Sequence, residues 1–290
     1  METRDWMILK ILHQENSITK TAELLYLSQP AMTKRLQQIE KEFGVEIVHR
    51  GKRGIHFTPQ GEYLAKCASD ILIMLNKIND GLVNLNDSIE GTLRIGASYF
   101  ITRHKLPELL SRFKRTYPKV NFKVTAGWSK DIFNLAHNQD VHIAIIRGDY
   151  NWKDQKSLLM EERVCVVSSE PLDLQDLPQL QRVDYKLDYK LKELIDHWWW
   201  ENYSEPPHVC MEVDKSDTCK EMVVRGLGYA IMPEFVLSQT EGLHTIAIKD
   251  QNGTTIKRNT WLLYHKEFLD LKLVKTFVEF TKELNFAELR

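Results

Sequence analysis

The chain of 290 residues carries a formal net charge of −1 at pH 7 and a pI of about 6.8, which excludes the overall basic charge of a protein that coats nucleic acid. Four cysteines without a Cys-x-x-Cys pair predict reduced thiols instead of a disulfide framework. The sequence has neither an apolar leader after Met1 nor an apolar run of membrane-spanning length. We therefore expect a cytoplasmic protein of two or three domains that needs no membrane partner.

Two helix starts lie close together near the beginning of the chain. Ser17 and Ser28 each stand where an N-cap is needed, because a side-chain oxygen there satisfies a free amide in the first turn of the next helix. Apolar residues recur at helical spacing behind both caps, and only a turn at residues 26–27 separates the two helices. Short helices joined this tightly cross steeply and leave the start of the second helix projecting. The pattern predicts a helix-turn-helix.

The second helix and a basic loop after it present side chains that suit double-stranded DNA. Glutamine can pair with adenine, threonine can contact a base edge, and lysine or arginine can reach guanine or phosphate. A solvated polar face is the alternative, but the order of cap, turn and polar face favours a DNA-binding helix followed by a wing. The predicted DNA-binding residues are Gln29, Pro30, Thr33, Lys34, Arg35 and Gln37 in the helix, and Arg50, Lys52 and Arg53 in the wing.

One run resembles the helix-turn-helix signature of the LysR-type transcriptional regulators: residues 22–33, with the sequence Ala-Glu-Leu-Leu-Tyr-Leu-Ser-Gln-Pro-Ala-Met-Thr. Further features of that family follow in order, namely Gly44 after the second helix, Arg50 in the wing, a Thr-Pro-x-Gly turn at residues 58–61 and a Gly-Thr-Leu-Arg-Ile-Gly strand at residues 91–96. The similarity covers essentially the whole chain. It implies a winged helix-turn-helix over residues 1–60, a linker helix over residues 61–89 and an effector-binding domain over residues 90–290.

The linker region carries an apolar stripe with alternating spacings of four and three residues. Such a heptad seam buries best against a second helix of the same kind, so it predicts a coiled-coil pairing of two chains. A long helix that packs on its own domain is the alternative. A homodimer, or a homotetramer built from two of them, would read a palindromic promoter site with two heads. The stripe consists of Leu64, Ala68, Ile71, Leu75, Ile78, Leu82 and Leu85.

Strand and helix signals alternate after residue 90. The apolar run at residues 141–146 is typical of a buried parallel strand. Two similar α/β halves resemble the periplasmic-binding-protein fold with which the family senses small molecules in a cleft. We expect an α+β multidomain fold whose effector domain has two lobes, with hinges at residues 157–163 and 264–268. The first lobe is predicted from residues 90–160 and 266–290, and the second from residues 161–265.

Three strand ends and helix starts are expected to face the cleft, because open α/β sheets expose backbone amides there. Each contains small hydroxyl side chains beside a helix N-terminus, as in the effector sites of the family. Helix capping alone explains Ser129 and Ser216 as well. The predicted effector contacts are Ser98, Tyr99, Phe100 and Ile101 after the first strand, Trp128 and Ser129 after the second, and Ser216, Asp217 and Thr218 in the other half.

Two arginines are predicted to bind an acidic effector. Arg147 directly follows the buried run, where an unpaired guanidinium is costly, and Arg258 lies in the opposite half. One fork from each half would suit citrate or another di- or tricarboxylate, and residues 147–148 and 219–222 are similar to the citrate-responsive branch of the family. An internal salt bridge of Arg147, for example with Asp149, is the alternative. Asp217 weakens the citrate hypothesis because it would repel a carboxylate.

No motif indicates catalysis, a cofactor or a metal. The histidines and cysteines lack the spacing of a metal site, and no nucleophile elbow or paired carboxylates occur. The three tryptophans at residues 198–200 cannot all point inward from one helix; local core packing is their expected role, and a subunit contact is the alternative. We predict a DNA-binding transcriptional regulator that is not an enzyme. An α/β solute-binding or enzymatic domain with an incidental helical N-terminal domain is the alternative.

Overall fold

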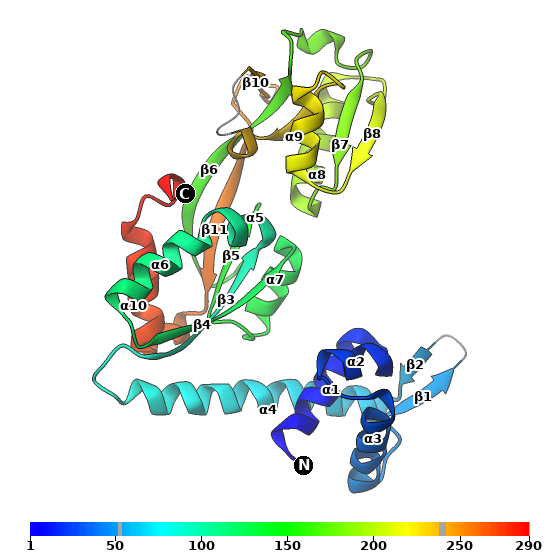
Figure 1. The fold of residues 1–290 in the computed structure, drawn as a ribbon, viewed down its shortest axis with the longest axis vertical. Coiled ribbons are helices and arrows are strands. Elements are labelled where there is room, and N and C mark those ends of the chain that lie inside the picture. The colour runs from blue at the N-terminus through cyan, green and yellow to red at the C-terminus, as the bar shows by residue number, and fades with distance from the viewer. Residues whose placement is uncertain (52–53, 238–241, 290) are drawn as a thin grey trace. The chain divides into compact units, whose positions relative to one another are not determined.

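The computed structural model describes residues 1–51, 54–237 and 242–289. These form two compact units, Met1–Asp87 and Ser88–Arg290, which we call the N-terminal unit and the C-terminal unit (Figure 1). No helix in the described part of the chain is long and apolar enough to cross a membrane.

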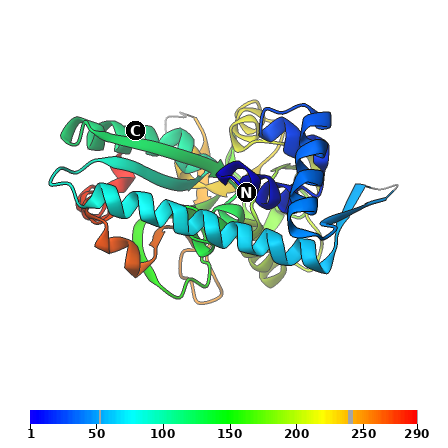
Figure 2. The ribbon, with the colours of Figure 1, turned by 90° about the horizontal axis from the view of Figure 1, so that it is seen from below.

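The N-terminal unit is a helix-turn-helix with a β-hairpin and a long final helix. Side-chain oxygens of Ser17 and Ser28 accept the amides of Lys20 and Ala31, so both predicted N-caps are confirmed. The hairpin of β1 and β2 projects from the helices of this unit (Figure 2). The elements are α1 (Thr3–Glu15), α2 (Ile18–Leu24), α3 (Gln29–Phe43), β1 (Val48–Gly51), β2 (Gly54–Phe57) and α4 (Pro59–Asn84).

The Thr-Pro-x-Gly turn joins the hairpin to α4. Thr58 caps the helix by accepting the amide of Gly61, and its hydroxyl donates to the carbonyl of Glu46 at 2.6 Å. Gly61 lies so close to the Ile47 carbonyl that a Cβ at this position would stand 2.1 Å from the oxygen. The glycine is therefore required by close approach of the backbone. The predicted linker helix begins two residues earlier, at Pro59, and ends at Asn84.

The apolar stripe of α4 has two parts. Its beginning packs on α1, and Ala68 is fully buried in the core of the unit. The later part is exposed, with Ile78 at 52%, Leu82 at 62% and Leu85 at 79% of their accessible surface. Apolar side chains in a row at this spacing are costly in water unless another surface covers them.

The C-terminal unit contains two lobes. Its first lobe has parallel strands flanked by helices, and its second lobe has a smaller parallel pair, β7 and β8 (Figure 1). The first-lobe elements are β3 (Gly91–Ser98), α5 (Tyr99–His104), α6 (Leu106–Thr116), β4 (Val120–Gly127), α7 (Ser129–His137), β5 (Ile143–Arg147) and α10 (Lys272–Glu283). The second-lobe elements are β7 (Arg182–Tyr185), α8 (Tyr189–Asn202), β8 (Val209–Val213), α9 (Ser216–Val224), β9 (Ala230–Pro233) and β10 (His244–Ala247).

Two long strands, β6 (Gln155–Ser168) and β11 (Lys257–Tyr264), connect the lobes (Figure 1). The sheet order is β10-β6-β11-β5-β3-β4, with β9 also paired to β6. The hinge predicted at residues 157–163 lies inside the continuous strand β6. The hinge predicted at residues 264–268 is wrong, because β11 already pairs with β5 of the first lobe from Thr260 to Tyr264. The chain therefore returns to the first lobe within β11, before the boundary predicted at residue 266.

Each lobe has its own apolar core. Phe113 and Phe277 are buried in the first lobe, where their rings pack edge to face at 4.9 Å. Trp198 and Trp199 are buried in the second lobe, where Trp199 donates its indole N–H to the Glu205 carbonyl, whereas Trp200 is 58% exposed. Core packing of two of the three tryptophans is thus confirmed, and the separate cores leave the space between the lobes free for a site.

Candidate functional site

Helix α3 has one buried face and one polar face. Met32, Leu36 and Ile39 lie in the core of the N-terminal unit, at the spacing that keeps them on one side of the helix. Ser28 caps the helix, and the first three residues of the helix, Gln29 to Ala31, are exposed. Five of the six residues predicted for DNA contact are exposed or half-buried on the remaining surface of α3: Gln29, Pro30, Thr33, Lys34 and Gln37.

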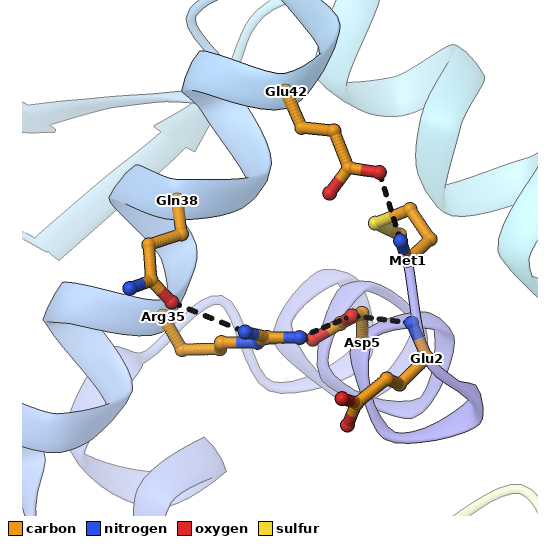
Figure 3. Close-up of polar contacts among 6 residues, drawn as sticks. All are labelled: Met1, Glu2, Asp5, Arg35, Gln38 and Glu42. Carbon is orange, nitrogen blue, oxygen red and sulfur yellow. Dashed lines mark hydrogen bonds and ion pairs between the residues drawn. The ribbon is translucent and has the colours of Figure 1, made fainter.

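Arg35, the sixth predicted contact, is directed at α1 instead. Its Nε and Nη2 donate to the two carboxylate oxygens of Asp5 at 2.5 and 2.7 Å, and Nη1 donates to Gln38 (Figure 3). Burial raises the pKa of Asp5, but the hydrogen bonds from Arg35 and from the Glu2 amide outweigh burial and lower it overall. This bidentate pair joins α3 to α1, and the DNA contact predicted for Arg35 stays a prediction.

The wing is described in part. Lys52 and Arg53 lie outside the described residues, and Arg50 belongs to β1 without a described side chain. Antiparallel pairing of β1 with β2 brings Arg50 opposite Ile55, which is buried, so the hairpin is anchored to the core of the unit. The predicted contribution of these three basic residues stays a prediction.

A cavity of about 540 Å³ lies between the two lobes of the C-terminal unit. Its volume falls in the range of small-molecule sites. Nine of the eleven predicted effector residues line it: Ser98, Tyr99, Phe100, Trp128, Ser129, Arg147, Ser216, Asp217 and Arg258. The other two do not. Ile101 is fully buried in the first-lobe core, and Thr218 is exposed on α9, since successive residues of a helix point in different directions.

The two arginines of the cavity already have carboxylate partners. Arg147 forms an ion pair with Glu162 of β6, and Arg258 with Asp188 at the start of α8. The four side chains are buried or nearly so, between 4% and 11% exposed. The internal salt bridge is therefore present, but the partner suggested from sequence is wrong. Asp149 instead accepts the indole N–H of Trp261 at 2.8 Å.

This cluster of two cations and two anions leaves little charge for a ligand. Burial lowers the pKa of Arg147, and the nearby charge of Arg258 adds to that effect while Glu162 opposes it. The guanidinium also lies 3.9 Å over the ring of Phe100. Its Nε remains buried without a hydrogen-bond partner among the described residues, as does Nε of Arg258. Each arginine therefore keeps at least one buried donor without a partner among the described residues, but no unbalanced charge.

The start of α7 offers further donors to the cavity. No side chain caps this nine-residue helix, whose N-cap residue is Trp128. The hydroxyl of Ser129 accepts the amide of Arg147 at 3.2 Å, which leaves its own proton free to donate. Ser98 is 5% exposed, and its hydroxyl has no partner among the described residues. Uncapped amides and two hydroxyls on one side of a cavity form a place for an anionic oxygen.

Contacts between the lobes cross the mouth and the wall of the cavity. Arg103 of α5 forms an ion pair with Asp217 of α9 at 2.8 Å, which uses the charge that was expected to oppose a carboxylate. The ring of Phe100 packs edge to face on Phe235 of the second lobe at 5.2 Å. His104 also lines the wall, and burial lowers its pKa. An ion pair and an aromatic contact therefore join the two lobes at the cavity.

The remaining walls are largely apolar. Trp128 and Tyr99 pack edge to face at 5.7 Å, and the aliphatic side chains of Leu187, Leu191 and Val236 lie elsewhere on the lining. Sequence reasoning missed the segment that contributes residues 185–188, because the four-residue strand β7 with its alternating charges has no strong strand signal. The N-cap at Asp188 was the available signal. The missed lining residues are Arg103, His104, Gly127, Tyr185, Lys186, Leu187, Asp188, Leu191, Asp214, Lys215, Pro233 and Val236.

Two family models match the chain. Residues 3–62 match the model described as bacterial regulatory helix-turn-helix protein, lysR family. Residues 86–285 match the model described as LysR substrate binding domain. Together they cover both units of the structure.

Known relatives and solved structures agree with the models. An uncharacterized HTH-type transcriptional regulator YraN of Bacillus subtilis is 41% identical over 282 residues, with 97% of this chain and 98% of that protein covered. A second regulator of that bacterium, YkuM, is 33% identical and covers 98% of both chains. The full-length structure of the Vibrio cholerae virulence activator AphB shares the fold, with a TM-score of 0.67 at 17% identity over 98% of this chain and 100% of that one.

Proposed function

The chain belongs to the LysR family of bacterial transcriptional regulators, and from this premise we propose how it reads DNA and what it senses. It is a DNA-binding regulator with an effector-binding domain. We propose that α3 enters the major groove with Gln29, Thr33 and Gln37 at base edges and Lys34 at phosphate or guanine. Pro30 lies in the first turn of the helix there, and the wing residues Arg50, Lys52 and Arg53 follow the backbone. The exposed polar face of α3 opposite its buried face carries this proposal.

We propose that two chains pair along α4 and that the dimer, alone or as a tetramer, acts in the cytoplasm on a palindromic promoter site. The exposed row of Ile78, Leu82 and Leu85 supports pairing, because a second α4 would bury it at heptad spacing. A solved structure of CbnR, which has a TM-score of 0.60 to this chain, contains CbnR complexed with its target DNA.

We propose that the effector is a small carboxylate held between the lobes, with its acid group at the start of α7. Ser98, Ser129 and the free Nε of Arg147 would donate to it, while Tyr99 and Trp128 would contact the rest of the molecule. The neutralised arginines argue for one acid group and an apolar body. Citrate and other polycarboxylates receive less support, because a second acid group would meet Asp188 or compete with Glu162.

The reading helix is tested by selection of sites. Duplexes recovered from a random library by the full-length chain define a preferred site, which should carry two symmetric half-sites. Gln29→Ala and Gln37→Ala should relax the preference at particular base pairs, each by roughly 1–3 kcal/mol per base pair. Gln14→Ala, an exposed change on α1, serves as the control and should leave the preference unchanged. Unchanged preference in both α3 variants would refute the placement of α3.

The effector site is tested by ligand-induced thermal shifts of the full-length chain. A panel of monocarboxylates with aromatic or aliphatic bodies, dicarboxylates and citrate should raise the melting temperature only for members with one acid group. Ser98→Ala should reduce the shift, whereas Ser111→Ala, an exposed serine on α6, should not. A shift by citrate alone, or an equal response in Ser98→Ala, would contradict the proposed geometry.

A further inference from the structure

Tyr26 occupies an unusual position in the turn between α2 and α3. Its side chain is 95% exposed, the highest value among the large apolar residues of the described chain. Its backbone has φ 54°, in the left-handed region. The amide donates to the Glu23 carbonyl at 3.1 Å, but the phenol has no hydrogen bond or ring contact with any described residue.

The fold gains nothing from tyrosine at this place. Left-handed φ disfavours a residue with a bulky side chain, and glycine or asparagine adopts it more readily. A fully hydrated aromatic ring also buries no surface. The left-handed φ itself belongs to the end of α2, where the Leu27 amide donates to the Ala22 carbonyl at 2.8 Å. The choice of tyrosine for this conformation is what points to a role outside the folded unit.

The surroundings of Tyr26 indicate the chemistry of its partner. The exposed guanidinium of Arg4 donates to the carbonyl of Leu25 at 3.1 Å, which places a positive charge beside the turn. Ser28, two residues after Tyr26, caps the proposed reading helix. When the start of α3 lies in a major groove, the turn before it lies at the edge of that groove, where the phosphates are.

We propose that Tyr26 and Arg4 together bind a DNA phosphate at the edge of the groove that α3 enters. The phenol donates one hydrogen bond to a phosphate oxygen, and the guanidinium supplies the charge. Such a contact positions the helix without reading sequence. The inference rests on the proposed placement of α3, and its test differs from that of α3 because a phosphate contact changes affinity, not base preference.

The experiment measures binding of the full-length chain to a labelled mixed-sequence duplex and to the selected duplex over a series of salt concentrations. Tyr26→Phe should weaken binding to both duplexes by about tenfold for each N-terminal unit that contacts the DNA, since each loses one hydrogen bond to a charged phosphate oxygen. The slope of log affinity against log salt should stay unchanged because the phenol is neutral. Arg4→Gln should reduce that slope by about 0.9 for each head.

A second variant separates binding from folding. Tyr26→Asn should raise the melting temperature of the chain, because asparagine tolerates left-handed φ, and yet weaken DNA binding at least as much as Tyr26→Phe. Tyr189→Phe, an exposed tyrosine in the C-terminal unit, is the control and should bind like the unmodified chain. Wild-type affinity of Tyr26→Asn for both duplexes would overturn the proposal. A loss confined to the selected duplex would overturn the phosphate assignment in favour of a base contact.

Discussion

Removal of the Glu162 charge should destabilise the C-terminal unit strongly. In Glu162→Gln the shape of the side chain is kept, but Arg147, which is 4% exposed, loses its carboxylate partner while Arg258 stays nearby. Breaking one partner of a buried ion pair costs about 3–5 kcal/mol. The amide still accepts one hydrogen bond, so we expect about 3 kcal/mol. For a unit of this size, that corresponds to a fall in melting temperature of roughly 6–12 °C.

Denaturation followed by tryptophan fluorescence measures this loss. Six of the seven tryptophans lie in the C-terminal unit, and only Trp6 lies in the N-terminal unit, so the signal reports the intended unit. Glu161→Gln is the matched control on the same strand. Glu161 pairs with Lys257 in an exposed bridge at 3.1 Å, and such bridges contribute about 0–1 kcal/mol.

A double variant tests the reasoning independently of the single change. Arg147→Met with Glu162→Leu removes both charges and replaces them by apolar side chains, which is often neutral for a buried pair. We therefore expect the double variant to be more stable than Glu162→Gln. A Glu162→Gln variant that melts within about 2 °C of the unmodified chain, or a double variant less stable than the single one, would refute the argument.

The same substitution has a consequence for ligand choice. With Glu162 neutral, the charge of Arg147 becomes available to an acid in the cavity. Dicarboxylates that leave the unmodified chain unaffected should then raise the melting temperature of Glu162→Gln. Absence of any gain would mean that the ion pair does not control which acids bind.

Two further changes test the close approach at α4 and the half-buried His104. Gly61→Ala places a Cβ 2.1 Å from the Ile47 carbonyl oxygen and should lower the free energy of unfolding by about 3 kcal/mol, measured by thermal unfolding followed by circular dichroism. In the control Gly81→Ala, on the same helix, the new Cβ meets nothing within 4 Å and should raise the free energy of unfolding by about 0.5–1 kcal/mol. Similar effects of the two substitutions would contradict the close approach at Gly61. Burial lowers the pKa of His104 below 6.5, so the unfolded chain binds its proton more readily, and the stability present above pH 6.5 is lost as pH falls. In melting curves recorded at a series of pH values, His104→Phe should reduce the fall of melting temperature at acid pH. The control His137→Phe, at an exposed histidine, should leave that fall unchanged. An unchanged fall in His104→Phe would exclude His104 as the cause.

Local patterns were sufficient to predict the N-terminal unit. Caps at Ser17 and Ser28, the turn between them and the glycine after α3 act through contacts within a few residues, and the structure has each of them. The order of strands and helices in the C-terminal unit was predictable for the same reason, because periodicity depends on neighbouring residues. Strand β7 was missed, since four residues of mixed charge carry too little local signal.

Partners that are distant in the sequence were decided by the tertiary structure. Sequence alone determined that this is a winged helix-turn-helix chain with a two-lobed domain, and it predicted that Arg147 and Arg258 would meet carboxylates. It did not determine which carboxylates those would be, because Glu162 and Asp188 reach them only through the pairing of β11 with β6 and the docking of α8. The partner of Arg35 was likewise decided by the fold, because α1 brings Asp5 beside it. A charge binds the opposite charge that folding places nearest, and that choice is made by long-range packing.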